Sequence, residues 1–224
     1  MSTAPAAPEE ADKAEPVLDT VERVSEMCFG LFMALTFVGA VSIATADDPN
    51  PARTMFAAAL GCNLAWGLVD AVMYLVRTLT VRGKRITAAL AVKNAADPAT
   101  GRRALAESMP PATRSLVGEA ELEAIRARLS AAALPARPRL YGRDYVGSVA
   151  IFLIVVATTF PVDLPFLLFD VKTGLVVSRV LTLIMLFGGG LALGHFAGFG
   201  GWKAGLGMTA LGVVLTIAII ALGG

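Results

Sequence analysis

The sequence is poor in cysteine and histidine, with two cysteines and one histidine among 224 residues. Two cysteines exclude a small secreted scaffold held by several disulfides, and one histidine excludes a zinc module built from Cys and His ligands. The 19 Lys and Arg residues are balanced by 18 Asp and Glu residues, which excludes a strongly basic nucleic-acid binder. We therefore expect no nucleic acid among the partners.

Catalytic motifs are missing as well. No G-x-S-x-G, H-E-x-x-H or P-loop sequence occurs, and the lone His195 cannot supply a plausible Ser-His-Asp set. We expect no enzymatic activity and no permanently bound cofactor.

Charged residues are scarce, at 17% of the chain, whereas soluble domains carry about 25%. Apolar residues make up 56%, and the mean hydropathy is +0.69. A helix needs about 20 apolar residues to cross a membrane, and five stretches meet that requirement. Pro161 and Pro165 interrupt the third stretch, so a kink is expected there. The sequence predicts an all-α integral membrane protein with five transmembrane helices, at residues 24–46, 54–76, 145–169, 175–196 and 204–222.

The charges are sorted along the chain. Residues 1–22 hold six acids against Lys13 and have no apolar face, which predicts a disordered acidic tail. Residues 77–144 contain 13 of the basic residues and six acids, and juxtamembrane Lys and Arg are retained in the cytoplasm. We expect this region to be a basic cytoplasmic insert, with the N-terminus inside and the C-terminus outside. The chain then divides into the tail, helices 1 and 2 in residues 23–76, the insert, and helices 3–5 in residues 145–224.

The insert carries two helical patterns. Apolar residues at helical spacing predict an amphipathic helix around Leu116, Leu122, Ile125, Leu129 and Ala133. A weaker helical stretch covers residues 85–96. The two helices are expected to pack on each other or on the membrane surface.

Asp70 is the most informative residue, since it lies seven residues before Arg77 and so roughly 10 Å inside the apolar boundary. A carboxylate at such depth costs about 3 kcal/mol. It shares helical spacings of three, four and seven with a stripe that we expect to face protein or water, formed by Asn63, Trp66, Asp70, Met73, Tyr74 and Arg77. The stripe predicts a cation or proton site. The alternative is a buried Asp70 that is hydrogen-bonded to Tyr74 or to a hydroxyl of another helix.

Two further regions hold pathway candidates. Glu26 precedes Met27 and Cys28, with Met33 two turns on, and carboxylate oxygen with sulfur suits Fe²⁺, Mn²⁺ or Zn²⁺. Asp163 follows Thr158 and Thr159 in the Pro-interrupted stretch, where irregular backbone is tolerated only around a cavity or inside protein. Asp163 is therefore either a second pathway residue or an acid at the membrane boundary.

The fourth apolar stretch contains the small-residue motif Gly190, Gly194 and Gly198. Glycines at this spacing let helix backbones approach closely, so we expect tight packing of the last two helices. The spacing leaves open whether the packing lies within one subunit or between two.

These features together resemble the vacuolar iron transporter family. The residues that carry the resemblance are TTFPVDLPFLLFD at 158–170, VSRVLTLIMLFGGG with Ser178, the glycine-rich ending GWKAGLGMTALGVVLTIAIIALGG, and ERVSEMCFGLFMALTFVGAVSIA, which is similar to the family's first helix. The resemblance covers residues 22–224. The second helix, ALGCNLAWGLVDAVMYL, differs from the usual one, so the chain looks like a divergent bacterial branch.

The resemblance implies a homodimer in the bacterial inner (cytoplasmic) membrane that exports Fe²⁺ or Mn²⁺ in exchange for protons. Phe29 stands where family members commonly have Asp, which leaves Glu26 and Asp70 as possible substitutes. Family members bind metal through Glu residues of the cytoplasmic helices. The corresponding candidates here are Glu119 and Glu123, although Glu123 can instead pair with Arg126.

A function of another class fits the same sequence. The protein would be a non-transporting oligomeric scaffold or a passive channel, with Asp70 as a structural hydrogen-bond partner. The basic insert would then bind anionic lipid or a cytosolic protein.

Overall fold

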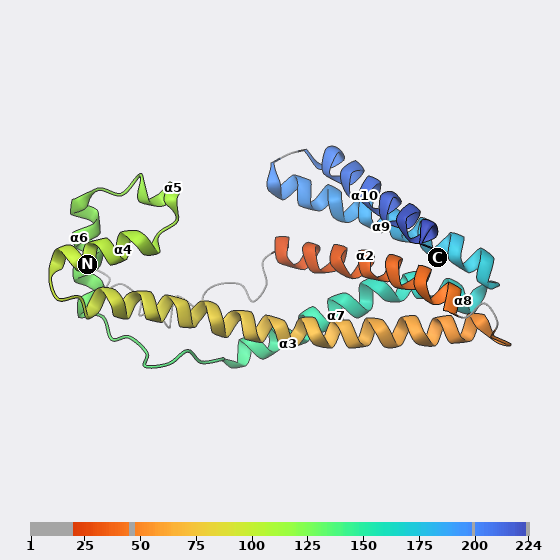
Figure 1. The fold of residues 1–224 in the computed structure, drawn as a ribbon, viewed down its shortest axis with the longest axis horizontal. Helices are drawn as coiled ribbons and strands as arrows, with labels where there is room; N and C mark the ends of the chain where they lie inside the picture. Colours follow the sequence, from red (N-terminus) through yellow and green to blue (C-terminus); the bar gives the residue numbers. More distant parts are fainter. Residues whose placement is uncertain (1–19, 45–47, 199, 223–224) are drawn as a thin grey trace, which may run out of the picture. The chain divides into compact units, whose positions relative to one another are not determined.

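The computed structural model of the chain describes residues 20–44, 48–198 and 200–222, which form helices and no strands (Figure 1). Five helical segments are long and apolar enough to cross a membrane, namely α2, α3, α7 together with α8, α9 and α10. The prediction of an all-α chain with five such helices is confirmed. The predicted tail lies outside the described residues except for residues 20–22, which begin α2. The helices are α2 (Thr20–Ala44), α3 (Pro51–Lys93), α4 (Pro98–Ser108), α5 (Pro111–Arg114), α6 (Glu119–Ala131), α7 (Gly142–Asp163), α8 (Pro165–Leu168), α9 (Val171–Ala197) and α10 (Gly201–Ala221).

The second apolar stretch and the weaker helical stretch after it form one helix, α3, of 43 residues. The sequence analysis predicted them as separate segments. Between them stands a single glycine, Gly83, and no proline, so nothing stops the helix. At 1.5 Å per residue α3 is about 65 Å long, roughly twice the thickness of a hydrocarbon core. Its charged C-terminal part therefore extends beyond the apolar layer.

Contacts divide the chain into two compact units. The bundle unit contains α2, α3 up to Tyr74, and α7 from Tyr145 through α8, α9 and α10. The insert unit is Leu75–Asp144, with the rest of α3 and α4, α5 and α6. Each unit has its own apolar core.

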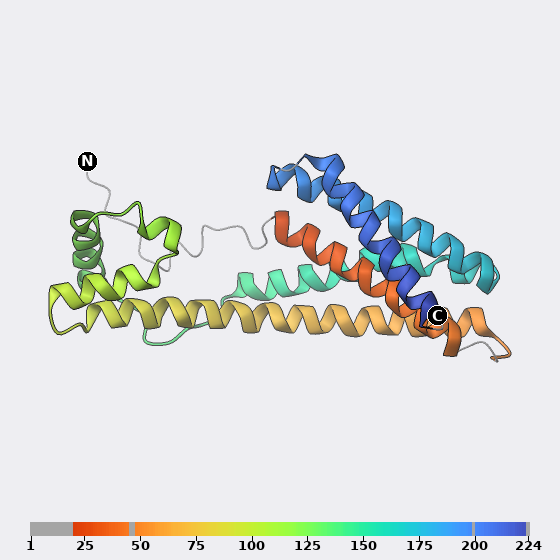
Figure 2. The same ribbon diagram turned by 45° about the horizontal axis from the view of Figure 1, so that its top comes forward.

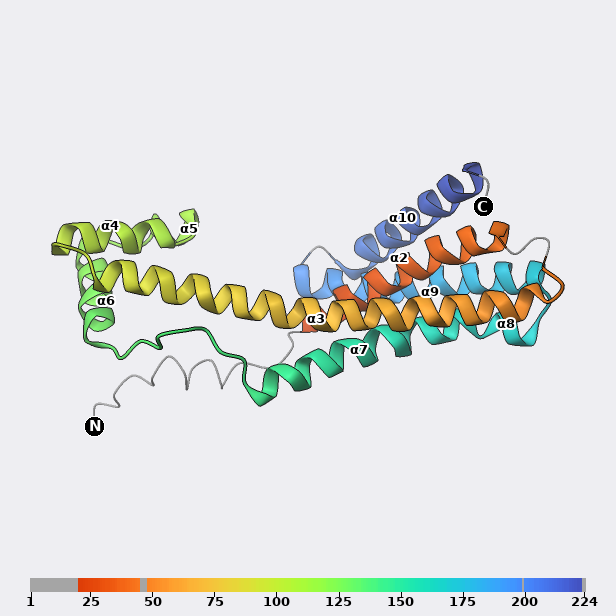
Figure 3. The same ribbon diagram turned by 60° about the horizontal axis from the view of Figure 1, so that its bottom comes forward.

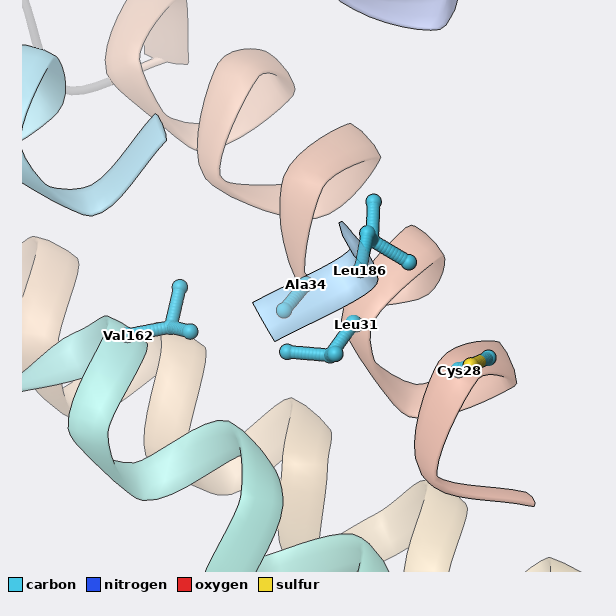
Figure 4. Close-up of a cluster of buried hydrophobic side chains, with 5 residues drawn as sticks. All are labelled: Cys28, Leu31, Ala34, Val162 and Leu186. Atoms are coloured by element: carbon cyan, nitrogen blue, oxygen red, sulfur yellow. The ribbon is translucent and has the colours of Figure 1, made fainter. Parts of the chain in front are cut away.

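The core of the bundle unit joins helices that are distant in sequence. Leu31 and Ala34 of α2 meet Val162 of α7 and Leu186 of α9, and Cys28 belongs to the same buried cluster (Figure 4). A second cluster joins Val38, Met55, Ala59 and Phe166. Large apolar side chains also remain exposed on the outer faces of the helices, as contact with lipid requires, for example Leu68, Leu153, Ile184 and Ile217.

Glycines bring α9 and α10 together within one chain (Figure 2). A Cβ on Gly190 would lie 2.7 Å from the carbonyl oxygen of Ala204, and one on Gly194 would lie 2.5 Å from the Cβ of Ala204. The sequence analysis grouped Gly198 with Gly190 and Gly194 as a packing residue, but Gly198 does not take part in this close contact. It ends α9 with a φ of 74° and has open space where a Cβ would stand. A left-handed residue at a helix end is the usual place for glycine.

The insert unit is built on Val92 of α3, Leu105 and Ala106 of α4, and Leu122 of α6, with Ile125 and Leu129 packed against them. Leu116 does not join this face, because α6 begins only at Glu119, and it is 86% exposed. The side chain of Asp97 caps α4 by accepting a hydrogen bond from the backbone N–H of Thr100. These contacts pack the C-terminal part of α3, α4 and α6 on one another, so the two predicted helical stretches meet together with α4, which the sequence analysis did not predict.

Arg82 of α3 contacts the segment at the C-terminal end of the insert unit. Its guanidinium donates to both carboxylate oxygens of Asp144, at 2.5 and 3.0 Å, and to the carbonyl oxygen of Arg139 at 2.9 Å. It also lies over the ring of Tyr141, 4.9 Å from the centroid. Both charged side chains are largely buried, so the pair fixes the chain that leads into α7 against α3.

Candidate functional site

One face of α3 is buried, and α7 runs beside this helix (Figure 3). Its buried residues recur every four positions, which is one stripe of a helix: Met55, Ala59, Asn63, Gly67 and Ala71. Met55 and Ala59 on this face pack with Val38 of α2 and Phe166 of α8, and the residues from Asn63 onward contact α7. Gly67 lets the helices approach, since a Cβ there would lie 3.1 Å from the ring of Phe152. The hydroxyl of Ser148 on α7 donates to the carbonyl oxygen of Ala71 at 2.9 Å. Asn63 stands in the middle of this apolar stripe.

Asn63 pairs with Asp163 of α7. Its side-chain amide donates to Oδ2 of Asp163 at 2.5 Å, and the two residues are 2% and 0% exposed. Oδ1 of Asp163 is buried and has no hydrogen-bond partner within the described part of the chain. A buried acceptor without a donor costs roughly 1–3 kcal/mol, and more if it carries charge. This carboxyl group is therefore the least satisfied polar group of the α3–α7 contact.

The hydroxyls nearest to Asp163 along α7 are already used. Thr159 is fully buried and donates to the carbonyl oxygen of Val155 at 2.9 Å, and Thr158 donates to that of Ile154 at 2.6 Å. Neither hydroxyl hydrogen is therefore directed to Asp163. Ser178 and Thr182 of α9 are also buried, four positions apart, with Thr182 donating to the carbonyl oxygen of Ser178.

Prolines surround Asp163. Pro161 lies inside the last turns of α7, Asp163 ends that helix, and Pro165 begins α8. Proline has no N–H, so Pro161 leaves the carbonyl oxygen four residues earlier without its helical donor. α7 ends at Asp163 and α8 begins at Pro165. Leu164 between them keeps an αR conformation and its N–H donates to the carbonyl oxygen of Phe160, so the expected kink stays a prediction.

Asp70 on α3 lies one turn after Trp66, whose ring contacts α2. The rings of Phe29 on α2 and Trp66 on α3 meet edge to face with centroids 6.0 Å apart. The two helices run in opposite directions (Figure 1). The turn that precedes Phe29 in α2 and the turn that follows Trp66 in α3 therefore lie on the same side of this ring contact. These positions are Glu26 and Asp70. Oδ2 of Asp70 is buried and, among the residues described, has no hydrogen-bond partner.

The polar stripe predicted on α3 does not face one environment. Asn63 is buried against α7, whereas Trp66 and Met73 are exposed on the surface of the chain, Met73 by 54%. Met33 is half-buried and lies one turn after Phe29 along α2, whereas Glu26 lies one turn before it. The structure therefore brings Asn63 to Asp163, and it places Trp66, one turn before Asp70, against Phe29, one turn after Glu26. The sequence did not reveal the first pairing, because it placed Asn63 with Asp70.

The two insert carboxylates are held by arginines. Arg102 donates to Glu119 at 3.0 Å and to Glu123 at 3.1 Å, and Arg126 donates to Glu123 at 2.6 Å. The hydrogen bonds from Arg126 and then Arg102 lower the pKa of Glu123 to about 2. The alternative that Glu123 pairs with Arg126 is thus realised. Over the described ranges, no cluster of three or more His, Cys, Asp or Glu side chains is arranged to hold a metal.

Comparison of the chain with protein-family models, with curated proteins and with solved structures found no match. The resemblance to the vacuolar iron transporter family therefore depends on the quoted sequence segments alone. One candidate site is the contact of Asp163 with Asn63, and the other is Asp70, whose buried Oδ2 has no hydrogen-bond partner among the residues described.

Proposed function

We propose that the protein is a multi-pass membrane transporter that exports a divalent transition-metal cation, Fe²⁺ or Mn²⁺, from the cytoplasm in exchange for protons. The observation that carries the proposal is Asp70, whose Oδ2 is buried on an apolar helix without a hydrogen-bond partner in the described chain. Ionisable residues within membrane helices are costly and mark ion pathways. A bound cation would offset that cost.

The side chains around Asp70 suit such a cation. Glu26 lies one turn before Phe29, whose ring contacts Trp66, one turn before Asp70. Met73 is on the adjoining turn of α3, and Met33 lies further along α2. Carboxylate oxygens with thioether sulfur form a ligand set for Fe²⁺ or Mn²⁺ rather than for Mg²⁺. Glu26, Asp70 and Met73 are the proposed metal ligands, and Met33, Asn63 and Asp163 line the proposed route.

One chain supplies only part of a coordination shell. Met73 and Trp66 face outward from the bundle unit next to Asp70, so a second copy against this face of α3 would complete the site. We therefore propose a homodimer in the bacterial inner membrane. Mass determination in mild detergent and in nanodiscs tests this assembly, and a monomer under both conditions would contradict it.

The proposed orientation follows the basic residues of the insert unit. With that unit in the cytoplasm, Asp70 and Glu26 lie toward the cytoplasmic side of their helices, and Asp163 lies toward the outer side. The metal would enter at Asp70 and leave past Asp163. The C-terminus would lie outside.

A non-transporting scaffold or passive channel is the second candidate. It is favoured by the insert carboxylates Glu119 and Glu123, which are engaged by Arg102 and Arg126 instead of being open to a metal. In this alternative the exposed Lys84, Arg137 and Arg139 would bind anionic lipid or a cytosolic protein.

Purified protein in proteoliposomes that enclose an Fe²⁺- or Mn²⁺-sensitive dye separates the two functions. We expect metal entry with the wild type, loss of entry with Asp70→Asn, and partial entry with Asp70→Glu. Asp170→Asn is the matched control, because Asp170 is an exposed helix cap and Asn caps helices as well as Asp does. Wild-type vesicles that behave like empty ones, or an Asp70→Asn variant that transports at the wild-type rate, would contradict the proposal.

A further inference from the structure

We propose that Asp163 and Asn63 form a dedicated proton-binding site, in which Asp163 is a neutral carboxylic acid in the conformation described here and does not ligate the metal. Proton binding at this site stands without any transport activity. Only its role in coupling proton movement to metal movement rests on the proposed function.

The first argument is the balance of charge around Asp163. Its side chain is fully buried and receives one hydrogen bond, from the neutral amide of Asn63. In the described chain no ion pair reaches it, and Oδ1 has no donor at all. An isolated buried carboxylate is strongly disfavoured, and such a group neutralises instead. A proton on Oδ1 removes the charge and leaves the bond from Asn63 to Oδ2 intact.

Titratable and charged groups on the packed helices do not supply the missing charge. On α3, Cys62 is the titratable neighbour that interacts electrostatically with Asp163. On α2, Cys28 lies in the apolar cluster with Val162, next to Asp163 in sequence. On α9, Arg179 is half-buried and, within the described residues, forms no ion pair with Asp163. Neither thiol is a cation, so a proton is the simplest counter-charge.

The second argument separates a proton from a metal. Fe²⁺ and Mn²⁺ need several ligands, usually including carboxylate, imidazole or water. Among the described residues, no second acid lies at this contact with Asp163, whose neighbour Asn63 turns an N–H group toward it, and Thr159 donates elsewhere. A proton requires a single lone pair, and Oδ1 offers one.

The third argument is the position of Asp163 at the junction of α7 and α8. Pro161 and Pro165 flank it, and each lacks the backbone N–H that would bond one turn back. Opening of the junction would let water reach Oδ1, and the acid would then ionise by breaking its O–H bond and passing the proton to water. Closing would require the reverse step. The pair would thereby bind one proton in the closed state and release it in the open state.

Infrared difference spectroscopy on the full-length protein in lipid tests the site directly. We expect the carbonyl stretch of a protonated carboxylic acid at neutral pH, loss of that band in Asp163→Asn, and its retention in Asp70→Asn. Isotopically labelled aspartate should shift the band in the wild type, which assigns it to an aspartic acid even if Asp163→Asn does not fold, and retention of the band in Asp70→Asn excludes Asp70 as its source. Absence of the band, its persistence in a folded Asp163→Asn variant, or its removal by Mn²⁺ in Asp70→Asn protein would overturn the proposal.

A flux measurement tests the coupling separately. In proteoliposomes, Asp163→Asn should still allow metal to move down its gradient but without proton counter-movement, whereas Asp70→Asn should stop metal movement. Proton coupling that survives in Asp163→Asn would overturn the coupling role. If the wild type moves no metal, the proposed function fails while the infrared band still decides the proton site.

Discussion

Asn63 donates a hydrogen bond of 2.5 Å to Asp163 although the two residues are 100 positions apart in the chain. The bond joins α3 to the last residue of α7, which lies between Pro161 and Pro165. The carboxyl group of Asp163 is thus buried with a hydrogen bond to one of its two oxygens. Such a group is suited to proton exchange.

Replacement of Asn63 by Leu should destabilise the protein by about 1–3 kcal/mol, since both oxygens of Asp163 are then buried without a donor. The free energy of unfolding in mixed micelles measures the effect. A double variant, Asn63→Leu with Asp163→Leu, should recover part of the loss because no polar group is left unsatisfied. A single variant as stable as the wild type would show that the bond contributes nothing.

A methyl group on Gly190 should weaken the packing of α9 on α10. A Cβ there would meet the backbone of Ala204 at 2.7 Å, and overpacking of this kind costs about 1–3 kcal/mol. Gly188→Ala is the matched control, because nothing lies within 4 Å of its Cβ position and Ala favours a helix by up to about 1 kcal/mol. Thermal unfolding in detergent compares the two, and equal melting temperatures would contradict the close contact.

Acid should weaken the contact between α4 and α6. The hydrogen bonds from Arg126 and Arg102 lower the pKa of Glu123 from 4.5 to about 2, so its contribution to stability is complete above pH 4.5 and is lost as the pH falls toward 2. The carboxyl resonance of Glu123 should titrate near that low value by NMR in micelles. Arg126→Met should raise the midpoint, and an unchanged midpoint would refute the assigned cause.

Membrane orientation can be determined by labelling cysteines from outside intact cells, after Cys28 and Cys62 are replaced. We expect Ser115→Cys, in the insert unit, to be protected from an impermeant reagent. Asn50→Cys, in the loop between α2 and α3, should react, and both positions are exposed on the chain. The reverse pattern would invert the proposed topology.

The number and type of the membrane helices could be predicted because apolar length alone decides them. The continuity of α3 could not, since the polar residues after Tyr74 reduce the apolar signal without breaking the helix. The glycine spacing also could not show that Gly190 and Gly194 pack within one chain. That packing depends on the turn after α9, where Gly198 takes a positive φ.

The candidate site was predictable only in part. Acids within apolar stretches can be recognised as candidates from the sequence alone, as is the case for Asp70, Glu26 and Asp163. The Asn63–Asp163 bond depends on which face of α3 meets α7, and that face is chosen by small buried residues such as Gly67 and Ala71. Small and apolar residues recur every four positions on either side of Asn63, and this spacing is the sequence signal that indicates the face.

The most direct test of the account is the simultaneous measurement of metal and proton flux. Proteoliposomes with the wild-type protein would receive a Mn²⁺ gradient while one dye reports internal Mn²⁺ and a second reports internal pH. The account predicts that Mn²⁺ entry is accompanied by proton exit, so that the vesicle interior becomes alkaline, and that Asp70→Asn abolishes both signals. Wild-type vesicles with no Mn²⁺ entry, or with Mn²⁺ entry at constant internal pH, would contradict it.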